Sequence, residues 1–511
     1  MKIMGLEDNA LFLSCWYERS RPVPLICMLT MIMGIMFLSF LSASMSASSP
    51  EAMWESLFHV VITIQAVVLI LGGSFFASRM ASRERTSETL DFHRNSPQPV
   101  VDKVIGLVAG STCVEWFIFA VLFMVELPFA LLASVTVKQI ILFNVSLILS
   151  GIFFHTTAAM VSLLSKQKKG TSSLGYIFLF FWFGMPAVAY AMSSAASPFF
   201  AYLLGSAAFQ YIFPDKAGHL AGRFYLFDCP LIILQALVQV PLVFLMFNGL
   251  KRIFSLPNSA AWSKKDVLCF CGFLFFMVVG FFVSNYIHMG ETLANGVITK
   301  IYPHSFKALL QQEVPMFSGL FVMAGIVASF FCVPSYFKRA KYEVFIKNGV
   351  TRDKAVLDDG ATSLVVMLLY VSLGIVFATP YLFVAGCSTF KGLAYVIILS
   401  SYVMAFAGFL EYFRLGRFRN NKIFFMTAMA VVWMFIPWVA ALMLNFKLAG
   451  NISVASISPF FGVGYAVSLL LESKPVDMVG VVSPCLVAGL MWLLAYQEWV
   501  AVKKQVAGAI S

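Results

Sequence analysis

Long apolar runs alternate with short polar segments along nearly the whole chain. About 20 consecutive apolar residues cross the hydrocarbon core of a bilayer as an α-helix. Twelve runs reach that length, so we predict membrane-spanning helices at 24–44, 57–77, 104–127, 139–164, 173–193, 230–249, 267–286, 315–336, 362–385, 390–412, 423–445 and 478–499. The pattern therefore predicts an all-α polytopic membrane protein.

The composition narrows the class of protein further. Hydrophobic residues make up 60% of the 511 residues and charged residues 12%, whereas soluble proteins have about 45–50% and about 25%. This excludes a soluble globular enzyme, a disordered chain and a collagen-like fibre. The net charge of +11 comes from basic residues spread over many short segments. We therefore expect no nucleic-acid partner, because nucleic-acid binding needs a basic patch or stripe.

The distribution of Lys and Arg between alternate loops predicts the orientation of the chain in the membrane. If the twelve runs cross in turn, 27 of the 35 basic residues fall on the side that holds both termini. Such an excess marks the cytoplasmic side, so we expect cytoplasmic termini and a place in the bacterial inner membrane. We expect the first apolar run to be a retained span, not a cleaved signal peptide, because Glu7, Asp8 and Glu18 precede it.

Short matches between the two halves of the chain indicate an internal repeat. In the fifth and eleventh runs, five residues recur at a constant offset of 251: Trp182, Pro186, Val188, Ala189 and Met192 recur as Trp433, Pro437, Val439, Ala440 and Met443. A Ser-Pro-Phe-Phe sequence at 197–200 recurs at 458–461. The matches keep their order, so we predict two six-span repeats in parallel orientation.

The repeat predicts how the chain is divided. The predicted parts are an N-terminal interfacial helix at 1–23, a first six-span unit at 24–249, a cytoplasmic linker at 250–266, a second six-span unit at 267–500 and a cytoplasmic tail at 501–511. Each unit has a long basic cytoplasmic segment after its second span and a long outer segment after its fifth. The outer segments, 194–229 and 447–477, are so apolar that we expect short interfacial helices there.

Motifs for catalysis are absent from the sequence. A phosphate-binding loop requires Gly-Lys-Ser or Gly-Lys-Thr, and neither occurs in this chain. The six histidines are dispersed, and no metal-ligand spacing is found. We therefore expect that the chain is not an enzyme and holds no metal, and that any ATP hydrolysis takes place in a separate subunit.

The segment Arg83–Pro97 after the second span has the most motif-like sequence, RERTSETLDFHRNSP. Thr86 or Ser87 can cap a short helix there, and Pro97 can end it. A charged, capped helix at the end of a span suits docking to a soluble partner. A solvated loop is the alternative interpretation, which explains the arginines but not the mixture of acidic and apolar residues.

This segment resembles the coupling region of type-2 ATP-binding-cassette (ABC-2) permeases, where Arg-Glu, Thr-Leu-Glu/Asp and Ser-Pro follow the second span. The amphipathic stretch 8–19, the Ser-Pro-Phe outer segments and the six-span plan are similar as well. The resemblance implies a separate ATPase partner, in two copies, that binds the ATP and Mg. The residues that it assigns to coupling are Arg83, Glu84, Arg85, Thr89, Leu90, Asp91, Phe92, Arg94 and Pro97.

The chain departs from the family pattern in two places. Glu88 stands where the family usually has glycine. The second half keeps only a faint version of the motif, with Glu343, Phe345 and Lys347 as the matching residues. We include these three residues as a second coupling site whose motif is degenerate.

Two acidic residues lie within the predicted third span. An ionisable group near the middle of a span costs about 3 kcal/mol or more unless it is paired, which makes Glu115 a functional-site hypothesis. A neutral glutamic acid bonded to a neighbouring helix is the alternative, and Gln65, His59 and His155 are candidate partners. Glu126 lies closer to the outer interface, where we expect it to be solvated.

Gln235 and Gln239 are four residues apart in the predicted sixth span and so share one helix face. Together with Glu115 they are our candidates for lining a translocation path. Hydrogen bonding between helices is the alternative role for these two amides.

The residues and the resemblance together predict the permease subunit of an ATP-driven exporter, which forms the path for a solute or a lipid. An ion-gradient-driven secondary transporter is one alternative, because twelve spans in two halves also suit that class. That class usually has a long central loop, whereas the central link here is short. A non-transporting membrane scaffold is the second alternative.

Overall fold

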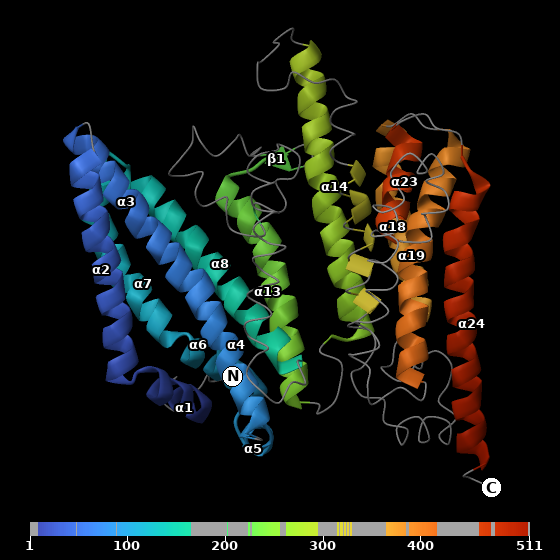
Figure 1. The fold of residues 1–511 in the computed structure, drawn as a ribbon, viewed down its shortest axis with the longest axis horizontal. Coiled ribbons are helices and arrows are strands. Elements are labelled where there is room, and N and C mark those ends of the chain that lie inside the picture. Colours follow the sequence, from blue (N-terminus) through green and yellow to red (C-terminus); the bar gives the residue numbers. More distant parts are fainter. Residues whose placement is uncertain are drawn as a thin grey trace, which may run out of the picture. The chain divides into compact units, whose positions relative to one another are not determined.

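The computed structural model describes residues 9–46, 49–87, 89–164, 202, 223–224, 227–255, 262–294, 364–384, 388–415, 459–471 and 476–508, together with helical positions between 314 and 329. The chain divides into two units, 1–257 and 258–511. Nearly all described residues are helical (Figure 1). The strands found among them are the two-residue β1 (Arg223–Phe224) and β2 (Phe227–Asp228), which pair antiparallel.

Eight of the described helices are long and apolar enough to cross a bilayer. These segments are Pro50–Arg85, Cys113–Leu132, Val137–Leu163, Leu231–Ser255, Lys264–Val283, Leu364–Phe383, Thr389–Tyr412 and Met478–Ala501. Each overlaps a predicted span, which confirms an α-helical polytopic membrane protein. The predicted spans at 173–193 and 423–445 lie outside the described residues, as does much of 315–336, and the twelve-span repeat stays a prediction.

The first unit contains nine α-helices and one π-helical turn among its described residues. They are α1 (Ala10–Arg19), α2 (Pro22–Ser46), α3 (Pro50–Ala66), η2 (Val67–Gly72), α4 (Gly73–Thr86), α5 (Thr89–Asn95), α6 (Val100–Ser111), α7 (Cys113–Leu132), α8 (Val137–Leu164) and α13 (Leu231–Ser255). Within this unit α4 and α13 pack on α8, α3 packs on α7, and α1 packs on α6.

Helix α1 is short, amphipathic and distinct from the spans. Its N-cap is Asn9, whose Oδ1 accepts hydrogen bonds from the backbone N–H groups of Leu11 and Phe12, both at 3.1 Å. Leu11 and Cys15 are fully buried while Tyr17 is exposed. The helix lies across the end of the first unit at which α5 is found (Figure 1). Its place at the membrane interface stays a prediction.

The second span is a helix of 36 residues that runs from α3 through α4. Between them the π-turn η2 replaces the α-helical hydrogen-bond pattern. The ring of His155 on α8 makes a hydrogen bond of 2.7 Å from Nε2 to the carbonyl oxygen of Leu69, inside the π-turn. Gly73 lets the two helices approach, because a Cβ there would lie 2.0 Å from His155 Nε2. The irregular turn is therefore held by a side chain of the neighbouring span.

The predicted single span at 104–127 is wrong in form, because the chain breaks into α6 and α7 at Thr112. The hydroxyls of Ser111 and Thr112 both donate to the carbonyl of Val108, at 3.0 and 2.9 Å. Such side-chain bonds compete with the helical ladder. Thr112 in turn accepts the backbone N–H of Trp116 at 3.1 Å and so starts α7.

The second unit is described for α14 (Lys264–Ala294), α18 (Leu364–Val384), α19 (Thr389–Leu415), α23 (Pro459–Leu471) and α24 (Met478–Gly508). Aromatic rings fill much of its interior, with the Phe275 centroid 5.8 Å from Phe321 and 5.5 Å from Tyr370. α19 packs against α24, where Trp492 Nε1 donates to the Met404 carbonyl at 2.9 Å. The short helix α23 falls within 447–477, a segment in which we expect a short helix.

Candidate functional site

The short helix α5 is fastened to the end of α4 by one buried carboxylate. Glu84 accepts a hydrogen bond of 2.6 Å from the Thr89 hydroxyl, and its other contact is with His93 Nε2 at 3.5 Å. Ser87 closes the turn between the helices by donating its N–H to the Arg83 carbonyl at 2.9 Å. The predicted short helix after the second span is therefore present, and Glu84 faces inward.

The opposite end of α5 is bonded to two further helices, α13 and α6. Arg94 donates from Nη2 to the carbonyl of Ile253 at the end of α13, at 2.9 Å. Lys103, at the start of α6, is buried and donates from Nζ to the carbonyls of Arg94 and Ser96, at 3.2 and 2.9 Å. Lys103 is not among the predicted coupling residues, although a cation is favourable at a helix C-terminus.

The outward face of α5 carries an aromatic and an acidic side chain. Phe92 is 72% exposed, and the side chain of Asp91 is 68% exposed although it pairs with Arg94 at 2.5 Å. Pro97 is exposed as well, whereas Leu90 is buried. Thr89 is exposed too, but its hydroxyl is bonded to Glu84 and so belongs to the contacts that hold the helix. The predicted coupling residues thus fall into two groups: an inner set that fixes the helix and an outer set that is free to touch another molecule.

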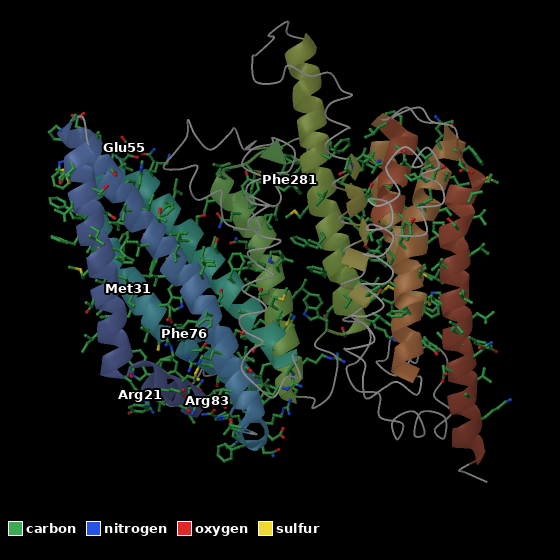
Figure 2. The ribbon with its side chains drawn as sticks, in the orientation of Figure 1. Arg21, Met31, Glu55, Phe76, Arg83 and Phe281 are labelled. Atoms are coloured by element: carbon green, nitrogen blue, oxygen red, sulfur yellow. The ribbon has the colours of Figure 1, made fainter. Side chains whose placement is uncertain are left out.

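Two arginines connect this region to other helices. Arg83 pairs with Glu18 of α1, and Arg85 donates to the carbonyl of Leu163 at the end of α8. Arg21 and Arg83 lie at one end of the first unit and Glu55 at the other (Figure 2). The ends of α1, α4, α5, α6, α8 and α13 are therefore linked by polar contacts at a single end of this unit.

Glu115 is buried where α7 begins, and its partner is Arg19 of α1. The Arg19 guanidinium also lies 3.3 Å above the Phe76 ring and donates to the Ser111 carbonyl at 3.3 Å, beside the break between α6 and α7. None of our candidate partners for Glu115 was correct. Arg19 was not predicted because it precedes the first span, whereas our candidate partners for Glu115 all lie within spans.

Gln235 and Gln239 on α13 are both fully buried and bonded to α8. Gln235 donates to the hydroxyl of Ser150 and to the carbonyl of Ser146, both at 3.0 Å. Gln239 donates to Ser150 at 3.1 Å and to the carbonyl of Tyr202 at 3.1 Å. These contacts are the ones expected from the alternative role of the two amides, which is hydrogen bonding between helices.

Glu126 is not solvated, contrary to our expectation, because its exposed fraction is 0%. It accepts hydrogen bonds from Asn144 of α8 at 2.9 and 3.1 Å. The predicted second coupling site at Glu343, Phe345 and Lys347 lies outside the described residues. Within the described part of the chain, no group of three or more His, Cys, Asp or Glu is placed to hold a metal ion.

Comparison with known proteins adds no relative to this picture. No protein-family model, curated protein or solved structure matches the chain.

Proposed function

We propose that this chain is the membrane-spanning permease subunit of an ATP-binding-cassette exporter, coupled to a separate ATPase through α5. The observation that supports the proposal is the two-sided construction of α5. Its inner residues are bonded to α4, α6 and α13, while Phe92 and Asp91 are exposed beyond the ends of these helices.

The bonds of α5 suit it to transmit movement. Glu84 ties it to α4, Arg94 to α13 and Lys103 to α6. A soluble subunit that changes shape on binding ATP and displaces α5 therefore displaces three helices together. A solvated loop without these bonds would absorb the same displacement locally.

The exposed face suits it to bind a protein. Aromatic side chains dominate the binding energy of many interfaces, and a hot-spot residue contributes about 2 kcal/mol or more. Phe92 is exposed on a seven-residue helix outside the apolar spans. We assign it as the anchor for the ATPase, with Asp91 beside it.

The rest of the assignment follows from the resemblance and the repeat. The second unit provides the equivalent contact at Glu343, Phe345 and Lys347, so that one chain binds two ATPase copies, which hold the ATP and Mg. Both termini are cytoplasmic, the membrane is the bacterial inner membrane, and the chain forms the translocation path.

Co-purification of the full chain in gentle detergent tests the proposal. An ATPase with vanadate-sensitive hydrolysis should copurify, and Phe92→Ala should weaken its affinity about 30-fold, the equivalent of about 2 kcal/mol. Phe117→Ala is the matched control, because Phe117 is exposed on the apolar surface of α7. If the chain purifies alone, or if both variants behave alike, the ion-driven and scaffold alternatives take precedence.

A further inference from the structure

A buried polar cluster joins three spans of the first unit away from α5. It consists of Gln65 on α3, Glu126 on α7 and Asn144 on α8, which are 0%, 0% and 5% exposed. Gln65 donates from Nε2 to Asn144 Oδ1 at 2.9 Å, and Asn144 donates from Nδ2 to both oxygens of Glu126. Asn144 therefore bridges the side chains of Gln65 and Glu126.

The surroundings of this cluster are apolar. Ile62, Ala130 and Ile140 lie one helical turn from the three polar residues, and all three belong to one buried hydrophobic cluster. A buried carboxylate in such a place requires a compensating positive charge, or it takes up a proton instead. Two amides alone do not neutralise the charge.

One acceptor in the cluster lacks a donor. Gln65 Oε1 is buried without a hydrogen-bond partner. The amide of Asn144 has no proton to spare for it, because Nδ2 already donates to Glu126 and to the Ile140 carbonyl at 2.9 Å. The cluster therefore lacks one hydrogen-bond donor, for Gln65 Oε1, and holds one carboxyl group with no cation beside it.

We propose that Glu126 is a proton-binding site, and that it carries a proton at neutral pH which it donates to Gln65 Oε1. A single proton removes the buried charge and supplies the missing donor at once. This bond links α3 to α7, while Asn144 links both helices to α8. The inference does not depend on the ATPase partner, and it would hold for any function of the chain.

The other ionisable groups on the three helices do not provide the charge. They are Glu51, Glu55 and His59 on α3, Glu115 on α7, and Lys138 and His155 on α8. Within the described part of the chain, the side-chain hydrogen bonds to the Glu126 carboxyl come from Asn144, which is an uncharged donor. Glu115 is bonded to Arg19, and His155 to the Leu69 carbonyl.

Infrared spectroscopy of the full chain in lipid nanodiscs tests the inference. At neutral pH the protein should show the C=O stretch of a protonated carboxyl, which shifts in D₂O and is lost in Glu126→Gln. Glu51→Gln is the control, because it removes an exposed glutamate from α3 and should leave this band unchanged. If Glu126→Gln does not fold, Glu126→Asp should move the band to a new frequency instead.

Three results would overturn the inference. The first is the absence of the band in the unmodified protein, and the second is its persistence in Glu126→Gln. The third is a carboxylate band that changes when Na⁺ replaces choline, which would make the occupant a metal cation and not a proton. A second measurement does not require the infrared band to be assigned. The melting temperature should fall as pH rises, because the folded state holds a proton that the unfolded chain releases. In Glu126→Gln the melting temperature should lose this dependence on pH.

Discussion

Arg19 and Glu115 form an ion pair across 96 residues of sequence, with side chains that are 10% and 0% exposed. The arginine reaches from α1 into the start of α7, and the Phe76 ring of α4 covers it. The pair therefore fixes the short interfacial helix to two spans, next to the break between α6 and α7. The same α1 is bonded to α4 through Glu18 and Arg83.

Removing one partner of this pair should be costly. Glu115→Leu leaves the Arg19 charge buried without compensation, for which we expect a loss of about 3–5 kcal/mol in the free energy of unfolding. The double variant Arg19→Met, Glu115→Leu should recover most of that loss, because it buries no charge. Unfolding in detergent, analysed as a double-mutant cycle, measures the coupling. Strictly additive effects of the two single changes would contradict a direct pair.

The contact of α1 with α6 should depend on Gly106. A Cβ there would lie 2.4 Å from Asn9 Oδ1, so we expect Gly106→Ala to push α1 off α6. Cys15 reports the change, because burial, aided by the nearby Glu84 carboxylate, raises the pKa of its thiol to about 12. Maleimide labelling of Cys15, read by peptide mass spectrometry, should rise from almost none. Gly34→Ala, at a position with open space, should leave labelling unchanged.

The stability of the π-turn η2 should depend on His155. His155→Phe leaves the buried carbonyl of Leu69 without its partner at 2.7 Å, which costs about 1–3 kcal/mol. We expect a corresponding fall in melting temperature. Ile152→Phe changes an exposed residue of the same helix and is the control. An equal fall in both variants would indicate a general effect of ring size in α8.

The packing of α5 on the end of α4 should depend on Glu84. Glu84→Ala removes the acceptor of Thr89 and the partner of His93, and loss of bonds to a charged group costs about 1.5–3 kcal/mol. Local opening of α5 should increase by about tenfold or more, measured as the rate of tryptic cleavage after Arg94. Asp91→Asn alters an exposed pair and should change that rate little. Unchanged cleavage in Glu84→Ala would show that other contacts hold the helix.

Hydropathy predicted the spans well because crossing a bilayer demands an apolar average over about 20 residues. It did not predict which face of each span is buried, since that depends on the neighbours. Glu126 illustrates the limit: its depth suggested solvent, whereas Asn144 of α8 encloses it. The partner of Glu115 was not predicted because Arg19 precedes the first span, whereas the candidate partners all lie within spans.

The short helix α5 was predictable because its signals are local. Pro97 and the polar residues after Arg83 are turn and cap signals that act within a few positions. The break at Thr112 also has a local cause, in the hydroxyls of Ser111 and Thr112. These residues are tolerated inside many helices, so their presence alone does not predict a break.

The π-turn η2 also changes which neighbours the second span meets. A π-turn takes up about one residue more than an α-turn, and each residue of an α-helix turns the side chain by about 100°. The face presented by α4 is thus rotated about the common axis relative to an uninterrupted helix. α3 packs against α7, while α4 packs against α8. Deleting one residue from 67–72 would make α3 and α4 one regular α-helix and remove the rotation between their faces. The span could then pack well against α7 or against α8, but not against both.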